Sequence, residues 1–259
     1  NAPELLEVVR KIEARGATHL AHRMLQICGQ VFRYGIATGR CSRDVAADLR
    51  GALAPHVAKH MAAVSPKELP ELLAAISRYD GETTTRLGLQ LLALTFVRTN
   101  ELIGAEWSEI DRSEAMWSIP GQRMKMKDEH LVPLSRQSLA ILKELHELNS
   151  DSRFIFAAAN RKKHISNNTL LYALYRLGYH SRMTGHGFRA VASTILNEAR
   201  ERGEHTFGED VIERQLAHCE RNKVRAAYNR AKYIQERITM MQWWGDFLDR
   251  QTNGQFIAL

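Results

Sequence analysis

The chain has 259 residues, of which 44% are hydrophobic, and this is enough to bury a full core in one or two domains. Its 36 Lys and Arg residues outnumber 29 Asp and Glu residues, and the resulting net charge of +7 favours a polyanionic partner such as nucleic acid. No stretch approaches a transmembrane span or a signal peptide. Three widely spaced cysteines, Cys28, Cys41 and Cys219, argue against a disulfide framework and for reduced thiols inside a cell.

The first 60 residues are predicted to be helical and to end in a linker. Apolar residues recur at helical spacing from Glu4 to Gly39, which predicts two helices separated at Gly16. A third, short helix is expected around residues 45–49, and the small and polar residues 52–60 are typical of a linker. Three helices form only a thin unit, and the chain begins without Met, so we expect it to be part of a longer protein.

A second domain is expected to start at Ser65. Ser65-Pro66-Lys67-Glu68 has the form of a capping box with proline at the first helical position. The helix that follows is predicted to reach Tyr79, and a second apolar helix is predicted to end at Arg98.

Residues 106–134 change from helical to strand-like patterning. Trp107 to Ile110, Met116 to Ile119 and His130 to Leu134 are separated by polar and Pro-Gly turns. They predict a small antiparallel sheet of three strands.

Helical spacing returns after this sheet. The expected helices cover residues 137–145, 167–177, 188–202, 210–217, 224–231 and 234–248. The last helix carries Met241, Trp244 and Leu248 on one stripe. This stripe is expected to pack on its own domain, or on a neighbouring protomer when subunits assemble. The predicted fold class is therefore α+β, mainly helical, with one small sheet.

Six residues form a combination that folding alone does not require: Arg98, Lys125, His186, Arg189, His218 and Tyr228. Two arginines, two histidines, a lysine and a tyrosine without a carboxylate cluster suit metal-free attack on a phosphodiester. Guanidinium groups bind phosphate oxygens bidentately, a tyrosine hydroxyl can act as nucleophile, and the remaining groups can move protons.

Each member of the set is a weak signal by itself. His186 and Arg189 stand three residues apart at a predicted helix start, where backbone N–H groups favour a phosphate. Arg98 has an obvious local partner in Glu101, and Lys125 falls in a turn where lysines are commonly only solvated. The tyrosine alone would be interpreted as a core aromatic residue.

The order and spacing of the surrounding stretches are more specific. The chain resembles the tyrosine recombinase (phage integrase) family, in particular the integrases of satellite phages and genomic islands. The matching stretches are residues 95–102, 123–125 with 130–135, 184–189, 215–218 and 224–231. Two departures are mild: Asn100 stands where proline or glycine is frequent, and Ala217 stands where many relatives outside this subgroup have glycine.

The resemblance implies a domain division and a set of partners. Residues 63–259 would form the catalytic domain, and residues 1–62 would form the second half of a helical, DNA-binding core-binding domain. The implied partners are double-stranded DNA at attachment sites, further copies of the chain in a tetramer on two DNA sites, and accessory DNA-bending proteins. No cofactor and no metal are implied, and the place of action would be the interior of a bacterial cell.

The resemblance also assigns roles to the six residues. Tyr228 would attack the scissile phosphate and form a 3′-phosphotyrosyl bond, and Arg98 and Arg189 would hold the non-bridging oxygens. Lys125 would protonate the leaving 5′-oxygen. His186 would assist proton removal from the tyrosine, and His218 would bind a non-bridging oxygen.

Three other functions stay open at this point. A type IB topoisomerase shares the chemistry but rejoins the same strand, and a non-catalytic DNA-binding regulator would keep Tyr228 only for packing. A zinc or metal nuclease is a more distant alternative, suggested by His218-Cys219 without a second ligand pair. Tyr233 is the rival nucleophile, although packing at the start of the last helix suits it better.

Overall fold

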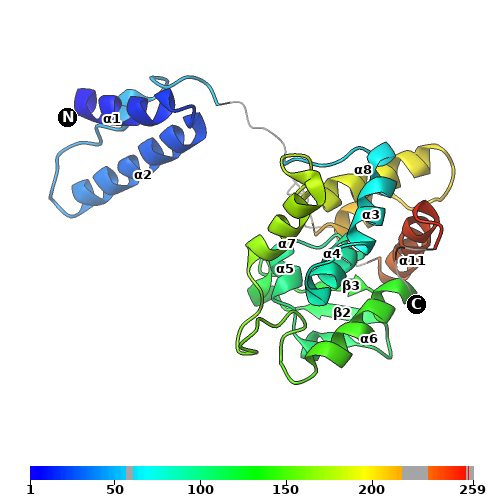
Figure 1. The fold of residues 1–259 in the computed structure, drawn as a ribbon. Helices are drawn as coiled ribbons and strands as arrows, with labels where there is room; N and C mark the ends of the chain where they lie inside the picture. Colours follow the sequence, from blue (N-terminus) through cyan, green and yellow to red (C-terminus); the bar gives the residue numbers. More distant parts are fainter. Residues whose placement is uncertain (57–60, 218–232, 255, 257–259) are drawn as a thin grey trace. The chain divides into compact units, whose positions relative to one another are not determined.

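The computed structural model describes residues 1–56, 61–217, 233–254 and 256. The chain divides into two compact units, Asn1–His60 and Met61–Leu259 (Figure 1). Each unit has its own hydrophobic cluster.

The first unit is built on two packed helices, α1 (Ala2–Ala14) and α2 (Thr18–Ala37). Asn1 caps α1, because its side-chain oxygen accepts the Glu4 amide at 3.0 Å and the Glu4 carboxylate binds back. Gly16 has a φ of 78° between the helices, a conformation that glycine adopts without strain. The third expected helix is a single 3₁₀ turn, Ala47–Leu49.

The core of this unit is small and includes part of the predicted linker. It consists of Val9, Ala21 and Leu53, with partly buried leucines and an isoleucine around them. The Ala54 amide donates to Glu13 at 2.7 Å and the Ala54 carbonyl bonds to His22 at 2.8 Å. The prediction that the linker begins at residue 52 was therefore wrong, because Leu53 is needed to close the apolar gap between the helices.

One face of α2 remains exposed. Its apolar side chains follow one another at intervals of four and three residues: Leu20, Met24, Ile27, Val31 and Tyr34. This spacing defines a continuous stripe along a helix. Two helices are too few to cover it, which agrees with the expectation that the unit is thin.

The second unit begins with the predicted capping box. Ser65 and Glu68 bind each other through side chain and backbone, and a 3₁₀ turn, Pro66–Glu68, leads into α3 (Leu69–Ser77). Helix α4 (Thr83–Thr95) follows and is buried over most of its length.

The predicted end of α4 at Arg98 was three residues too late. Phe96 takes a left-handed conformation with a φ of 40° and ends the helix, with its amide bonded to the Leu92 carbonyl at 2.8 Å. Arg98 instead caps a separate short helix, α5 (Thr99–Ile103). Five residues are too few for a helical period to be visible in the sequence.

The three-stranded antiparallel sheet is confirmed, although its first strand starts at Ile110, because Trp107–Glu109 forms a 3₁₀ turn. It consists of β1 (Ile110–Asp111), β2 (Met116–Ile119) and β3 (His130–Pro133), in the order β1-β2-β3. Trp117 pairs with Val132 and Ile119 pairs with His130. All four of these side chains are buried, so this face of the sheet contributes to the core.

The remaining helices also follow the predicted order. They are α6 (Arg136–Asn149), α7 (Asn167–Leu174), α8 (Gly187–Glu201), α9 (Glu209–Gln215) and α11 (Ile234–Gln251). Helix α7 continues into a π-helical turn, Tyr175–Tyr179, in which Gly178 has a φ of 86°. The helix predicted for residues 224–231 lies outside the described residues.

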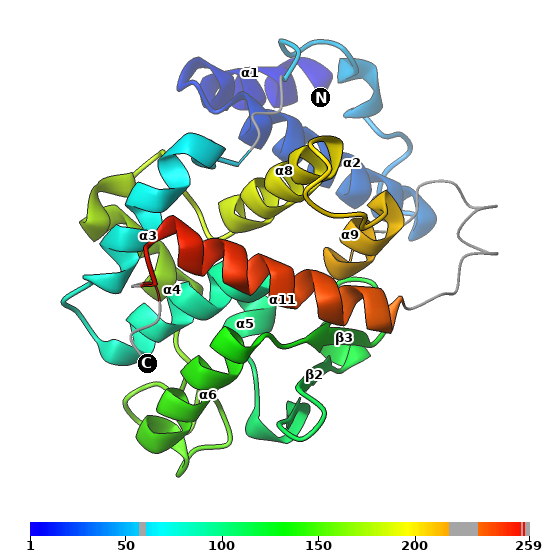
Figure 2. The same ribbon diagram turned by 90° about the vertical axis from the view of Figure 1, so that its right-hand side faces the viewer.

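Helix α11 packs within its own unit. It contacts α3, α4, α6, α9 and β3, and Figure 2 shows it crossing α4 with α6 and the sheet on one side and α8 and α9 on the other. The Trp244 indole donates to the Ala93 carbonyl at 2.9 Å and meets the Phe96 ring edge-on at 5.9 Å. The apolar stripe of α11 is thus buried in this unit, which agrees with the expectation that it packs on its own domain.

Within the described part of the chain, no helix is both long and apolar enough to cross a membrane.

Candidate active site

Arg98 is held by the helix that it caps. Its backbone amide donates to the Glu101 carboxylate at 2.9 Å, and its Nη1 donates to the same carboxylate at 2.7 Å. Glu101 is only 3% exposed, whereas a quarter of the Arg98 side chain remains accessible. The local ion pair that the sequence indicates is therefore present, and it fixes the arginine at the start of α5 rather than removing it from solvent.

Arg189 lies in the first turn of α8 and is 3% exposed. Its Nη1 donates to the Phe96 carbonyl at 2.8 Å, and its Nη2 donates to the Leu216 carbonyl. The Nε atom is buried and has no hydrogen-bond partner among the described residues. Burial, followed by the nearby charge of Arg98, lowers the pKa of Arg189 to about 10, so the guanidinium stays charged at neutral pH.

The two arginines meet at the end of α9. Arg98 Nη2 donates to the Ala217 carbonyl at 3.1 Å, while Arg189 binds the carbonyl of the preceding residue, Leu216. Two guanidinium groups that are 91 positions apart in the sequence thus contact consecutive peptide groups directly before His218. Each group keeps further N–H donors, because a guanidinium carries five and the contacts described here use two.

His186 caps α8 and is exposed, while the residues on either side of it are buried. A Cβ atom on Gly185 would lie 2.3 Å from Thr99 Oγ1, and one on Gly187 would lie 2.6 Å from the Ala62 carbonyl oxygen. The glycines are needed for packing within the protein. The Gly187 amide donates to Thr184, so this N–H is not available to a phosphate as the helix-start argument expected.

Lys125 lies on the turn between β2 and β3, as predicted, and is exposed. The residue before it, Met124, is buried in the core. The lysine is therefore adjacent to Met124, whose buried side chain fixes the loop to the core.

His218 and Tyr228 lie outside the described residues, as does Cys219. Tyr233 is described: it caps α11 with a φ of 48° and packs, partly buried, against the main hydrophobic cluster. This position agrees with the packing role that the sequence favours for Tyr233.

Residues 62–234 match the phage integrase family, and residues 1–52 match the phage integrase central domain. The first range is more than half of the chain and contains all six candidate residues. The chain belongs to the phage integrase family.

Relatives among phage proteins cover nearly all of this chain. The integrase of Enterobacteria phage P4 is 38% identical over 271 residues, which span 98% of this chain and 60% of the relative. The integrase of Shigella phage Sf6 is 36% identical and covers 96% and 63%. The chain therefore spans less than two thirds of the length of these relatives.

Solved integrase structures share the fold. A lambda integrase tetramer bound to a Holliday junction superposes with a TM-score of 0.66 at 18% identity, covering 86% of this chain and 65% of that one. The Tn1549 transposon integrase in complex with circular intermediate DNA gives 0.60 at 11% identity, covering 89% and 85%. The predicted fold class, a tyrosine-recombinase catalytic fold with a small antiparallel sheet, is confirmed.

This phage integrase chain contains a buried polar link that sequence reasoning missed. Arg237 in α11 is 1% exposed, and its Nε and Nη2 donate to Gln215 Oε1 at 3.0 and 2.7 Å. Its Nη2 also donates to the Leu131 carbonyl in β3. The sequence holds one signal, because Arg237 stands on the apolar stripe of α11, four residues before Met241.

His130 is a second residue that was missed. It begins β3, is 6% exposed, and its pKa is lowered to about 3 by burial and then by the charge of Arg237. Arg189 and Arg98 lower the pKa further, and the Gln215 backbone opposes them. At neutral pH, His130 is therefore uncharged, and the positive charges of the nearby arginines favour this neutral form.

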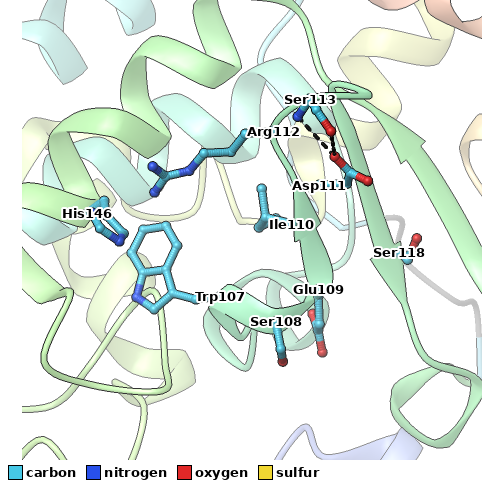
Figure 3. Close-up of a pocket in the computed structure, with 9 residues that line it drawn as sticks. All are labelled: Trp107, Ser108, Glu109, Ile110, Asp111, Arg112, Ser113, Ser118 and His146. Atoms are coloured by element: carbon cyan, nitrogen blue, oxygen red, sulfur yellow. Dashed lines mark hydrogen bonds between the residues drawn. The ribbon is translucent and has the colours of Figure 1, made fainter.

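An open pocket of about 580 Å³ lies at the outer edge of the sheet (Figure 3). The Trp107 ring meets the His146 ring edge-on at 4.9 Å, and the Arg112 guanidinium lies 5.6 Å from the Trp107 ring centre. Nine residues line it: Trp107, Ser108, Glu109, Ile110, Asp111, Arg112, Ser113, Ser118 and His146. None of the six candidate residues is among them, so this pocket is separate from the arginine pair.

No group of three or more His, Cys, Asp or Glu side chains that could hold a metal ion occurs in the part of the chain that the structure describes.

Proposed function

We propose that this chain is the DNA-cleaving and rejoining part of a site-specific recombinase that integrates or excises a mobile element. Membership of the phage integrase family supports this proposal. The observation that carries it is the convergence of Arg98 and Arg189 on consecutive carbonyls directly before His218. Two fixed cations with unused N–H donors suit the two non-bridging oxygens of one phosphodiester.

In the proposed reaction, the Tyr228 hydroxyl oxygen attacks phosphorus and the bond to the 5′-oxygen breaks. A 3′-phosphotyrosyl bond and a free 5′-hydroxyl result. Because the energy of the phosphodiester is kept, a 5′-hydroxyl of a partner duplex can reverse the step without ATP. Arg98 and Arg189 stabilise the charge that develops on the phosphoryl oxygens, which is the part that a metal ion plays in other enzymes.

The remaining candidate residues move or hold protons. Lys125 protonates the leaving 5′-oxygen, and His186 assists proton removal from Tyr228. His218 donates a hydrogen bond to a non-bridging oxygen. A free tyrosine has a pKa near 10, so the nucleophile depends on this cationic and basic setting at neutral pH.

We further propose that residues 63–259 are the catalytic domain and residues 1–62 are part of a core-binding domain. The match of residues 1–52 to the phage integrase central domain supports the second assignment. The partners proposed are double-stranded attachment sites, a tetramer of this chain on two such sites, and accessory DNA-bending proteins. The tetramer is suggested by the lambda integrase assembly on a Holliday junction. The place of action proposed is the interior of a bacterial cell.

The test is covalent capture of DNA. The 259-residue chain would be incubated in EDTA with supercoiled plasmid that carries the DNA flanking its own gene, and SDS would then trap protein–DNA adducts. We expect adducts with the wild type and none with Tyr228→Phe. Arg189→Lys should reduce adduct formation about 100-fold or more, because a point charge cannot replace a bidentate donor.

Three outcomes would contradict the proposal. An adduct on a peptide containing Tyr233 would show that Tyr233, and not Tyr228, is the nucleophile. Relaxed plasmid without strand exchange between two duplexes would indicate a type IB topoisomerase. Sequence-specific binding without any adduct would indicate a non-catalytic regulator.

A further inference from the structure

Arg123 is the most completely bound side chain near the proposed catalytic lysine. Its Nε and Nη2 donate to the two carboxylate oxygens of Glu109 at 2.9 and 2.7 Å. Its Nη1 donates to the Glu101 backbone carbonyl at 3.2 Å. Glu109 also accepts the Trp117 indole N–H at 3.0 Å and is largely buried, so the partner of Arg123 is itself fixed. Figure 3 shows Glu109 below β1, at the edge of the pocket.

Glu101 connects this arrangement to the arginine pair. Its carboxylate binds Arg98, and its backbone carbonyl binds Arg123. One residue of α5 therefore fixes both the phosphate-binding arginine and the residue two positions before Lys125.

The space around Arg123 is closely fitted. A Cβ atom on Gly104, which ends α5, would lie 2.6 Å from Arg123 Nη1. The φ of Gly104 is −86°, which any residue can adopt. A larger residue at position 104 would therefore meet the guanidinium, and the Asn100 carbonyl oxygen at 3.3 Å, rather than a forbidden backbone conformation.

The loop that carries Lys125 is compact beyond this point. The Met124 side chain is buried, the Lys127 amide donates to the Met124 carbonyl at 3.2 Å, and Lys127 has a φ of 66°. A Cβ atom on Gly121 would lie only 2.2 Å from the Lys127 carbonyl oxygen, so the two ends of the turn touch. Lys125 is exposed in this loop, and its position follows from how the rest of the loop is held.

We infer that Arg123 is a positioning residue for Lys125: by clamping the base of the β2–β3 loop to Glu109 and to α5, it sets the proton donor relative to Arg98. This inference rests on the proposed function. Lys125 must deliver a proton to the 5′-oxygen of the phosphate that Arg98 holds, and small errors in such placement cost rate steeply. Arg123 itself is not expected to touch DNA.

Changing the leaving group can show which residues act through proton delivery and which act in other steps. An alkoxide needs a proton when the P–O bond breaks. A thiolate does not, because a thiol has a pKa near 8.5 and leaves as the anion. A duplex with sulfur in place of the 5′-bridging oxygen should therefore bypass Lys125, and with it any residue that acts only by positioning Lys125.

The experiment compares single-turnover cleavage of oxygen and sulfur suicide duplexes at the site mapped by the adducts above. The variants are Lys125→Ala, Arg123→Met and Gly104→Ala, all in the 259-residue chain. The matched control is Arg153→Met, which removes an exposed arginine from an ion pair with Glu106 of 2.8 Å. Circular dichroism and gel shifts would show whether each variant is folded and binds DNA.

We expect Arg123→Met and Gly104→Ala to slow cleavage of the oxygen substrate about 10-fold or more. Both variants should cleave the sulfur substrate within about 3-fold of the wild type, as Lys125→Ala should, because the sulfur leaving group needs no proton. Arg153→Met should be unchanged with either substrate. Gly104→Ala keeps every charge, and its Cβ atom would meet the Arg123 guanidinium at 2.6 Å and the Asn100 carbonyl oxygen at 3.3 Å. If Arg123→Met is unfolded, folded Gly104→Ala provides the test.

Equal slowing of the oxygen and sulfur substrates by folded Gly104→Ala would overturn the inference, because the arginine would then act on the phosphate contacts or on the fold. Wild-type rates in both variants would also overturn it. Failure of the wild type to cleave either substrate would instead overturn the proposed function, and the inference with it.

Discussion

Two residues next to the arginine pair adopt a left-handed backbone although neither is glycine. Phe96 has a φ of 40° and Ala217 has a φ of 48°. Their conformations aim the Phe96 carbonyl at Arg189 and the Ala217 carbonyl at Arg98. Such a conformation costs a non-glycine residue about 1 kcal/mol and is found where surrounding contacts enforce it, often at functional sites. The contacts of Arg98 and Arg189 with these two carbonyls therefore help to hold the strained conformations.

The structure also explains the departure noted at Ala217. Glycine, which the resemblance to the family implies for relatives outside this subgroup, would adopt a φ of 48° without strain. The resemblance to the family drew attention to the position, but only the dihedral angle gives the physical reason for glycine.

His130 should make stability fall at mildly acidic pH. Its pKa in the folded protein is about 3, against about 6.5 in an unfolded chain. Between these values the unfolded state takes up a proton that the folded state rejects, so the free energy of unfolding decreases as pH falls. The decrease between pH 7 and pH 5 amounts to about 2 kcal/mol for this one group.

The measurement is urea unfolding at pH 7 and pH 5, followed by tryptophan fluorescence, for the wild type and His130→Gln. We expect the variant to lose about 2 kcal/mol less stability than the wild type over this interval. His205, whose pKa burial also lowers, is present in both proteins and cancels. An identical pH dependence of the two proteins would contradict the prediction, because it would show that His130 has the same pKa in the folded and unfolded states.

At the scale of elements, Arg237 joins three parts of the fold that surround the proposed site. It lies on α11 and binds Gln215 at the end of α9 and Leu131 in β3. Arg237→Met should lower the free energy of unfolding by about 2–4 kcal/mol, because Gln215 then keeps a buried oxygen without its donor. Arg250→Met, an exposed arginine on the same helix, is the matched control and should change it by less than about 0.5 kcal/mol.

A double-mutant cycle distinguishes this link from simple loss of packing. The Gln215 Nε2 has no partner among the described residues, so the amide is poorly satisfied even in the wild type. Replacing both residues, as Arg237→Met with Gln215→Leu, should cost less than the sum of the single changes by about 1 kcal/mol or more. Strict additivity in denaturant unfolding would contradict a direct interaction.

Elements with a clear period were predicted well, and elements set by distant contacts were not. The sheet followed from Trp117, Ile119 and Val132 between Pro-Gly and polar turns. Helix α5 was missed because five residues show no period. The contact of Arg98 with Ala217 spans 119 positions, and no local pattern indicates it. The resemblance to a family brought these residues together in the sequence analysis, and periodicity did not.

The candidate site shows the same limit. The six residues were nominated from the sequence, and the structure places Arg98 and Arg189 together, with Lys125 on its predicted turn. The supporting residues were not found, because Glu109 and Arg123 look like ordinary surface charges until the fold buries their contact.

At the scale of the whole molecule, positive charge is unevenly divided. Residues 1–60 hold nine Lys and Arg against five Asp and Glu, so they carry +4 of the net +7 in less than a quarter of the chain. The second unit has its own extensive core, to which Leu72, Leu92, Ile141 and Leu196 belong. Cutting the chain between the units is therefore expected to leave the second unit folded but to remove much of the positive charge.

The last prediction is that residues 61–259 alone unfold cooperatively but bind duplex DNA with a shallower salt dependence. The slope of log Kd against log salt reports the number of phosphate contacts, at about 0.9 per contact. Losing a net charge of +4 should lower the magnitude of the slope by about 2–4. Fluorescence anisotropy with a labelled duplex between about 50 and 200 mM NaCl measures it, and thermal unfolding of residues 61–259 shows that the unit is folded. An unchanged slope would place the DNA contacts entirely on the second unit, since a unit that touches no phosphate releases no counterions when it is removed.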